Sequence, residues 1–355
     1  MNRIHAIQYL RALAALAVVA LHTGKRAAES LPEGAVLWLP LGNAGVDLFF
    51  VISGFIMWSI GHYTQPAPGP FLLRRAFRVA PPYWIATLAW LGLVTAAGYD
   101  WITVTAGHVA ASLAFVPHYS PTFGDQVWPV LVPGWTLNYE MFFYLAFAAC
   151  LFVPARHRLM ALVGLLGTLV VLGALLAPRA AIAATYTSPL LLEFLGGCLV
   201  AALWLRAPGG IARNAAVLAA GIAVLLLFGR GVDPDDHAQR TLVWGTAGVL
   251  IVSGTLGLGT LIPRLPRLER LGDASYAIYL FHLLLVVPAA EVWQRLPQLH
   301  SAPGAALFVV LTMALVIWMG LAIFHYVERP LQRRLNGLVL GRQGAPAAAA
   351  PREAR

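Results

Sequence analysis

Long apolar runs alternate with short polar segments along this chain. Ten of the runs have about the 17–25 residues that a helix needs to cross a bilayer. They lie near residues 7–24, 44–61, 79–98, 134–153, 159–177, 187–206, 213–229, 241–259, 274–291 and 304–326. Clusters rich in Pro and Gly, such as QPAPGP at 65–70 and SAPG at 301–304, separate several of them. The pattern predicts an all-α, polytopic membrane protein with about ten transmembrane helices. An eleventh, shorter run at 105–116 is expected to be re-entrant or interfacial.

The composition also indicates a membrane protein. Hydrophobic residues make up 59% of the 355 residues and charged residues only 11%, whereas soluble domains average about 25% charged residues. No hydrophilic stretch is long enough to fold as a domain of its own. We therefore expect one transmembrane domain over residues 1–337, followed by a low-complexity, disordered cytoplasmic tail over 338–355.

The basic residues are distributed unevenly between alternate loops. With the N-terminus placed in the cytoplasm, 17 of the 24 Lys and Arg residues fall on the cytoplasmic side and six on the other, with Arg11 inside a span. This positive-inside bias predicts an even number of spans and cytoplasmic N- and C-termini. The net charge of +9 is scattered over loops, which does not favour nucleic-acid binding. A cleavable signal peptide over residues 1–24 is disfavoured, because Arg11 interrupts the apolar run and Lys25 and Arg26 follow it.

Three ionisable residues lie inside apolar runs: Arg11, His22 and Glu140. Such groups are costly at membrane depth and commonly mark a functional cavity or pathway. Arg11 and His22 are eleven residues apart, which is three turns plus roughly 20° and a rise of about 16 Å. One helix face therefore carries both. The predicted orientation puts Arg11 near the cytoplasm and places His22, Asp47 and Glu140 toward the periplasm.

A second cluster of basic residues, Arg74, Arg75 and Arg78, lies in the run FLLRRAFR, at the expected cytoplasmic mouth. Guanidinium groups bind phosphate oxygens in pairs, so these residues suit a phosphorylated ligand. Fixing the topology or binding anionic lipid headgroups is an equally open role for them. His22 suits proton transfer, and Glu140 is expected to orient its imidazole, as the third member of a catalytic triad does. The alternative for both residues is a structural hydrogen bond.

The remaining polar and small residues receive more ordinary interpretations. Gly42, Gly45 and Gly54 are expected to permit close helix approach or backbone contact with a ligand, since the lysine of a phosphate-binding loop is missing. Cys150 and Cys198 are read as small packing residues. No metal site is expected, because the His and Cys spacing fits none. His282 either lines the cavity or packs in the core, and Glu328 is expected to cap the last span.

Six features follow one another along the chain: the Arg11-x10-His22 pair, GVDLFFVISGF at 45–55, RRAFR at 74–78, WTLNYEMFFY at 135–144, SYAIYLFH at 275–282 and ERP at 328–330. Together they resemble the membrane acyltransferase family 3 from about residue 5 to residue 335. The opening IQYLRALAALAVVALH is most similar to the branch that acetylates exopolysaccharides.

The resemblance implies a ten-helix enzyme of the bacterial inner membrane that moves an acyl group, usually acetyl, from cytoplasmic acyl-CoA to a sugar hydroxyl at the periplasmic side. Acetyl-CoA would be a co-substrate, and no permanently bound cofactor is implied. The acceptor would be a polysaccharide or a lipid-linked oligosaccharide. By the family's pattern His22 is the catalytic residue, Glu140 is its acidic companion, and Arg11, Arg74, Arg75 and Arg78 bind the CoA end. Further substrate contacts are expected from Asp47, Ser53, Tyr139, Tyr276 and His282. Direct transfer and a covalent acyl-histidine both remain open.

Two other classes of protein fit part of the pattern. A transporter for an acylated sugar or another anion would also place charges and glycines inside helices. It is disfavoured because no pair of matching broken helices marks two related halves. A non-catalytic scaffold for polysaccharide assembly would need none of the arginines.

Overall fold

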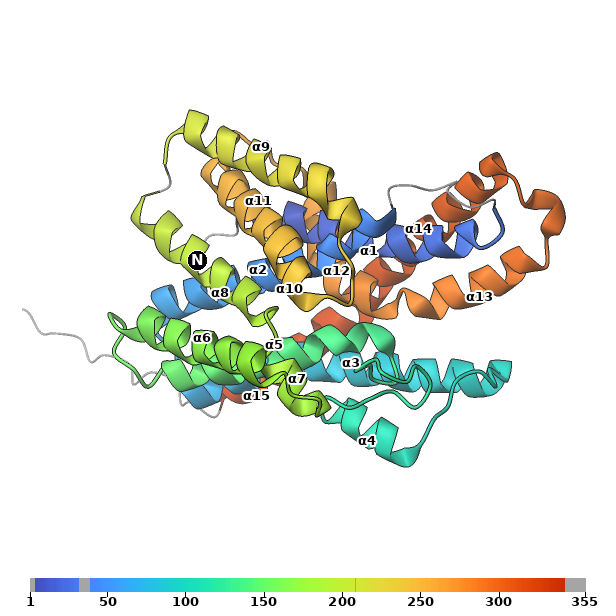
Figure 1. Ribbon diagram of the computed structural model, residues 1–355, viewed down its shortest axis with the longest axis horizontal. Helices are drawn as coiled ribbons and strands as arrows, with labels where there is room; N and C mark the ends of the chain where they lie inside the picture. Colours follow the sequence, from blue (N-terminus) through green and yellow to red (C-terminus); the bar gives the residue numbers. More distant parts are fainter. Residues whose placement is uncertain (1–3, 32–38, 208, 342–355) are drawn as a thin grey trace, which may run out of the picture.

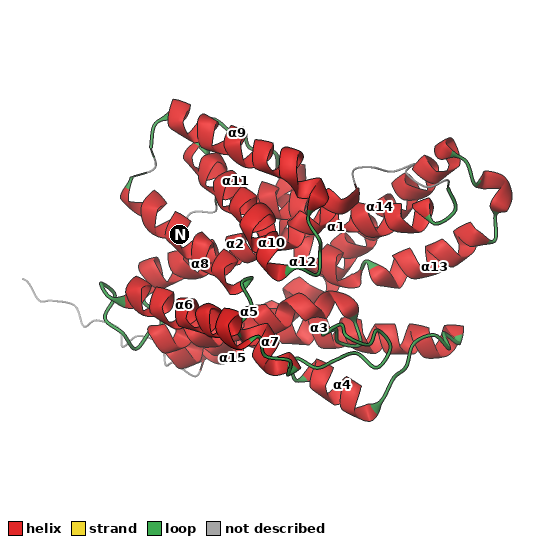
Figure 2. Cartoon of the chain, viewed as in Figure 1, coloured by secondary structure: helices red, strands yellow, loops and turns green. Residues whose placement is uncertain are grey.

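The computed structural model describes residues 4–31, 39–207 and 209–341, and within them the regular structure is entirely helical (Figure 2). The helices are α1 (His5–Ala28), α2 (Ala44–Thr64), α3 (Pro68–Ala97), α4 (Ala106–Leu113), α5 (Trp135–Cys150), α6 (Arg158–Leu176), α7 (Ala181–Tyr186), α8 (Leu191–Arg206), α9 (Ile211–Phe228), α10 (His237–Arg240), α11 (Thr246–Gly257), α12 (Pro266–Phe281), α13 (Leu283–Gln294), α14 (Ala302–Ile323) and α15 (Arg329–Gly341). Short π-helical turns precede α11 and α15. The all-α prediction is confirmed for the described residues.

When helices are counted as membrane-spanning by their length and hydropathy, the structure has fewer of them than the sequence predicts. In the described part of the chain, seven helices are long and apolar enough to cross a bilayer, and the bent pair α12–α13 makes an eighth. Each of the ten predicted runs overlaps helical structure, but α5 has only 16 residues, and the 12 residues of α11 continue from α10 through a π-helical turn. At about 1.5 Å per residue, α5 is shorter than the roughly 30 Å hydrocarbon core. The count of ten and the cytoplasmic position of both ends therefore stay predictions.

The outer helices carry the apolar surface of a membrane protein. Large side chains on α6, α9 and α14 are exposed, among them Leu175 (76%), Leu227 (74%) and Trp318 (70%). A soluble monomer rarely exposes a continuous apolar surface of this size. These helices therefore suit contact with lipid tails, and the protein is a multi-pass membrane protein.

Helix α1 lies in the interior, where it packs against α2, α12 and α14 (Figure 1). Close approach depends on glycines, as predicted. A methyl group at Gly45 would lie 2.5 Å from the Ala14 carbonyl oxygen on α1. One at Gly54 would lie 1.9 Å from the Phe194 carbonyl oxygen on α8. This central position of α1 also argues against a removable signal segment.

The predicted span at 274–291 is not one straight helix. It bends by 60° between α12 and α13, at His282. The imidazole Nδ1 of His282 lies 2.6 Å from the Tyr279 carbonyl oxygen. In an uninterrupted helix that carbonyl would accept the N–H of Leu283, four residues on. We attribute the bend to this competition between side chain and backbone.

Three further boundaries differ from the sequence analysis. Helix α3 begins at Pro68, so the RRAFR cluster lies inside a helix rather than just before the predicted span at 79–98. The segment at 105–116 contains α4, whose eight residues are too few to span a membrane. Helix α15 continues to Gly341, into the predicted tail, and the rest of that tail lies outside the described residues.

Candidate active site

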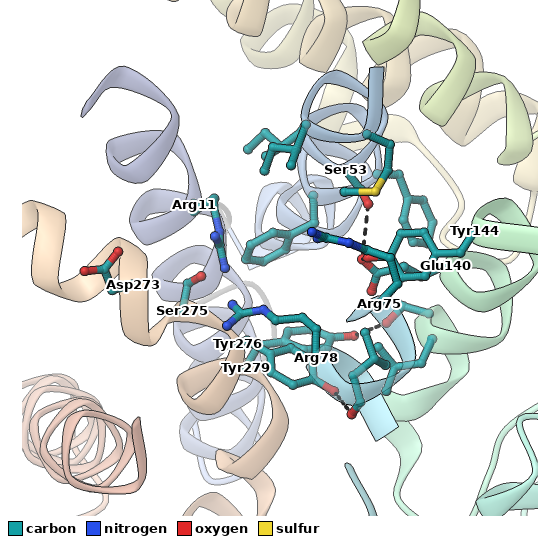
Figure 3. Close-up of a pocket in the computed structure, with 18 of the residues that line it drawn as sticks. Arg11, Ser53, Arg75, Arg78, Glu140, Tyr144, Asp273, Ser275, Tyr276 and Tyr279 are labelled. Atoms are coloured by element: carbon teal, nitrogen blue, oxygen red, sulfur yellow. Dashed lines mark hydrogen bonds between the residues drawn. The ribbon is translucent and has the colours of Figure 1, made fainter. Parts of the chain in front are cut away.

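A cavity of about 580 Å³ opens among α1, α2, α3, α5, α12 and the α14–α15 junction (Figure 3). This volume is within the range of small-molecule binding sites. Four arginines and two carboxylates line it, together with hydroxyl groups and apolar side chains. Its polar lining residues are Arg11, Ser53, Arg75, Arg78, Thr136, Glu140, Tyr144, Asp273, Ser275, Tyr276, Tyr279, Arg329 and Gln332. The structure thus brings together Arg11, Arg75 and Arg78, which the sequence analysis selected from two separate segments.

The arginines differ in their partners. Arg78 donates to Glu328 at 2.8 Å and to Gln332 at 2.9 Å, and its guanidinium lies 5.9 Å from the centre of the Tyr276 ring. Arg11 and Arg75 form no hydrogen bond or ion pair with another described residue, and the buried Nε of Arg75 has no partner. Unpaired guanidinium groups in a half-buried cavity favour an anionic ligand with several oxygens.

Glu140 does not pair with His22, which corrects the expectation of a catalytic dyad. Its carboxylate lies in the arginine-lined cavity, where it accepts hydrogen bonds from Ser53 at 3.1 Å and from the hydroxyl of Tyr144 (Figure 3). The reason is packing: Glu140 and Tyr144 are one turn apart on α5, and both face α2 and α3. Glu140 is therefore part of the arginine-lined cavity.

Glu328 is also corrected, from a helix cap to an ion-pair partner between helices. Its side chain is fully buried, and Arg78 donates to it from α3. A buried carboxylate requires such a partner, because removing a charge from water costs several kcal/mol. The motif ERP thus joins the C-terminal helices to the RRAFR segment: Glu328 holds Arg78, and Arg329 lines the same cavity.

His22 lies near the opposite end of α1 from Arg11, about 16 Å along the helix axis. Its Nδ1 is 2.9 Å from the Val18 carbonyl oxygen, and its ring packs against that of His282, with centroids 4.8 Å apart and planes at 57°. The fully buried His282 follows Tyr279 by one turn of α12. The histidine pair, His22 and His282, replaces the expected pairing of His22 with Glu140.

Neither member of the histidine pair lines the cavity, but Tyr279 does, and its ring centroid lies 6.2 Å from that of His282. Phe49 and Tyr279 both line the cavity, and their ring centroids are 5.9 Å apart. The hydroxyl of Tyr279 donates to the Pro133 carbonyl oxygen at 2.9 Å and lies 3.1 Å from the hydroxyl of Thr136. Tyr279 therefore contacts both the arginine-lined space and His282.

Asp47 and Tyr139 belong to another buried group, outside the cavity. Asp47 accepts two hydrogen bonds from Arg240, at 3.0 and 3.3 Å, and both residues are buried. The Arg240 guanidinium also lies 5.3 Å from the ring centroids of Trp135 and Trp244. Tyr139 packs against Trp135 on the same side of α5. Asp47 is therefore the counter-ion of Arg240 and does not share the cavity of Glu140.

The other predicted site residues divide between the two regions. Ser53 and Tyr276 line the cavity as expected, although the Tyr276 hydroxyl donates to the Val79 carbonyl oxygen at 2.8 Å. Arg74 does not line it. Both cysteines are buried and free, which suits packing residues. Within the described ranges, no group of three or more His, Cys, Asp or Glu side chains could hold a metal ion.

The sequence analysis missed several residues that line the cavity. A signal existed for some of them: Ser275 and Tyr279 are four residues apart and so share a helix face, and Tyr144 follows Glu140 by the same interval. No sequence feature indicated a buried role for Arg240, because the sequence analysis counted it among the basic residues of the loops. The missed residues are Thr136, Tyr144, Asp273, Ser275, Tyr279, Arg329 and Gln332 in the cavity and Arg240 outside it.

Comparison with known proteins identifies the family of this chain. The acyltransferase-3 family model, described as an acyltransferase domain, matches residues 4–322. The exopolysaccharide production protein ExoZ of Rhizobium meliloti (strain 1021) is 40% identical over 298 residues, which cover 83% of this chain and 90% of that protein. BcsY of Komagataeibacter xylinus, provisionally named a membrane-bound transacylase, is 29% identical over 92% of this chain and 83% of its own length. The acyltransferase MdmB of Streptomyces mycarofaciens is 27% identical over 98% of this chain and 95% of its own.

No solved structure is significantly similar to this chain. The family match, however, spans the helices from α1 to most of α14, which contribute most of the cavity lining, whereas Arg329 and Gln332 on α15 lie beyond it. The chain therefore belongs to the acyltransferase-3 family of membrane acyltransferases, in the exopolysaccharide branch represented by ExoZ.

Proposed function

We propose that this protein is an O-acetyltransferase of the bacterial inner membrane. It takes an acetyl group from acetyl-CoA on the cytoplasmic side and transfers it to a hydroxyl of an exported polysaccharide on the periplasmic side. The main support is the arrangement of charged and titratable groups: the guanidinium groups of Arg11 and Arg75, without a partner among the described residues, line the cavity, and the histidine pair lies at the other end of α1 from Arg11. Family membership and the similarity to the exopolysaccharide production protein ExoZ support the reaction class and the kind of acceptor.

The arginine-lined cavity would bind the donor. Arg11 and Arg75 would bind the phosphates of CoA, because planar guanidinium groups match pairs of phosphate oxygens. Arg78 would join them by exchanging part of its contact with Glu328 and Gln332 for the ligand. The carboxylate of Glu140, already fixed by Ser53 and Tyr144, would accept hydrogen bonds from the amide groups of the pantetheine arm.

The flexible arm would then carry the thioester toward the histidine pair. To reach His22 it would pass Phe49 and Tyr279, which line the cavity and whose ring centroids are 5.9 Å apart. The apolar lining on this route, including Val46 and Phe50, suits a pantetheine chain and excludes water. Because Arg11 and His22 lie toward opposite ends of α1, the phosphates could stay bound at the arginines while the acyl group reacts at His22.

His22 would act as the general base. Its Nε2 removes the proton of the acceptor hydroxyl as the hydroxyl oxygen attacks the thioester carbon. The carbon–sulfur bond breaks, and the proton passes from the imidazole to the leaving thiolate, which gives an O-acetyl ester and free CoA. In the two-step alternative, Nε2 itself attacks and an acetyl-histidine forms first. General-base assistance contributes typically 10²–10⁴-fold to the rate.

The test is release of the CoA thiol by purified protein in liposomes supplied with acetyl-CoA and polysaccharide. We expect His22→Ala to lower thiol release by about 10²-fold or more while acetyl-CoA binding is retained. His62→Ala is the control, because His62 is exposed at the end of α2. Mass spectrometry of the polysaccharide would show loss of the acetyl group in the His22 variant. A wild-type protein that moves saccharide across the bilayer without releasing thiol would instead be a transporter.

A further inference from the structure

The hydrogen bonds of the histidine pair determine where its lone pairs are. The Nδ1 of His22 lies 2.9 Å from the Val18 carbonyl oxygen, and the Nδ1 of His282 lies 2.6 Å from that of Tyr279. A carbonyl oxygen can only accept, so each Nδ1 carries a hydrogen. In the neutral rings both Nε2 atoms are therefore acceptors with a free lone pair.

The Nε2 of His282 has no partner in the described part of the chain. Its side chain is fully buried, and this nitrogen makes no hydrogen bond. The nearby hydroxyl of Tyr279 already donates to the Pro133 carbonyl oxygen. A buried polar atom without a partner is unusual and destabilising. The orphaned acceptor lies beside the imidazole to which the proposed function assigns the proton.

Two neutral Nε2 acceptors cannot hydrogen-bond to each other, but a proton on one of them changes this. The rings already lie 4.8 Å apart between centroids, so a small rotation brings their edges together. A proton on the Nε2 of His22 would then be donated to the lone pair of His282. This bond is absent in the resting protein and forms only when His22 is charged. Because it stabilises the transition state and not the ground state, it would lower the activation barrier of acyl transfer.

We propose that His282 is a positioning residue for His22. During acyl transfer an imidazolium forms on His22, and the Nε2 of His282 accepts a hydrogen bond from it. This inference rests on the proposed function. The proton leaves the acceptor hydroxyl, is shared between the two Nε2 atoms, and returns from His22 to the CoA thiolate as the carbon–sulfur bond breaks. His282 gains and loses nothing over the cycle.

Two substitutions separate this role from the structural role of His282. Asn places its amide near the position of Nδ1, so His282→Asn keeps a donor for the Tyr279 carbonyl but leaves nothing at Nε2. Gln reaches farther, so His282→Gln supplies an acceptor oxygen where Nε2 lies. We expect His282→Asn to lower kcat roughly 10- to 100-fold, the effect of losing a hydrogen bond to a charged group. The KM for acetyl-CoA should stay within about twofold, since the arginines are unchanged. His282→Gln should recover most of the lost rate.

Both variants are compared with wild-type protein by CoA thiol release at saturating acetyl-CoA, and their folding is checked by acetyl-CoA binding and elution in detergent. The inference is overturned if His282→Asn is not the slower of the two variants. The reverse order would show that His282 serves only to hold the bend at Tyr279. A wild-type protein that releases no thiol would refute the proposed function, which is a distinct result.

Discussion

At the scale of single residues, Arg74 and Arg75 are neighbours in the sequence but lie in different surroundings. They follow each other on α3, yet only Arg75 lines the cavity, because one residue turns a helix by about 100°. The sequence analysis assigned both to the donor. Composition selects an arginine-rich segment, but it does not tell which of its guanidinium groups faces the ligand.

This pair gives a matched prediction. Arg75→Ala should raise the KM for acetyl-CoA roughly 10- to 150-fold, the equivalent of about 1.5–3 kcal/mol for hydrogen bonds to a charged group. Arg74→Ala should leave it within about twofold. The measurement is thiol release at varied acetyl-CoA concentration. Equal effects of the two substitutions would mean that the cavity does not bind the phosphates.

At the scale of helices, small residues decide which elements touch. Helices α2 and α8 approach each other through Gly54 and Gly197, and a methyl group at either would lie 1.9 Å from a backbone oxygen of the other helix. The sulfhydryl of Cys198 lies 3.4 Å from the Gly54 carbonyl oxygen in the same contact. This contact fixes α2, and with it Ser53 in the cavity and Asp47 against Arg240.

Substitution at this contact should therefore destabilise the whole helix pair. We expect Gly54→Ala to cost about 1–3 kcal/mol, as overpacking does, and to lower the thermal midpoint in detergent. Gly167→Ala on α6 is the control, because no atom lies within 4 Å of the added methyl group. That change should be neutral or slightly stabilising, since Ala favours a helix over Gly by roughly 1 kcal/mol. An unchanged midpoint for Gly54→Ala would contradict this account of α2–α8 packing.

At the scale of the whole molecule, function depends on which end of the helices faces which compartment. The loop between α5 and α6 and the loop between α13 and α14 lie at opposite ends of the long axis (Figure 1). The arginine-lined cavity lies toward the first end, near the start of α1 and α3, and His22 toward the second. The positive-inside bias predicts that the first end faces the cytoplasm.

Cysteine labelling in intact cells would test this orientation. Arg156 and Gln298 are exposed in the two loops, and the buried native Cys150 and Cys198 would be replaced by Ala. A membrane-impermeant maleimide should modify the Gln298→Cys variant and leave Arg156→Cys unmodified until the cells are lysed. The opposite pattern would place the arginines outside, and acetyl-CoA could then not be the donor.

The sequence by itself determined the features that arise from local periodicity and from short motifs. The apolar runs predicted every long helix, the eleven-residue spacing placed Arg11 and His22 on one helix, and six ordered motifs indicated the family. Only the tertiary structure decided the partners. Glu140 binds Ser53 and Tyr144, Asp47 binds Arg240, Glu328 binds Arg78, and His22 packs on His282. Helical periodicity shows which residues share a face, whereas the choice of the facing helix depends on close packing between segments far apart in the chain.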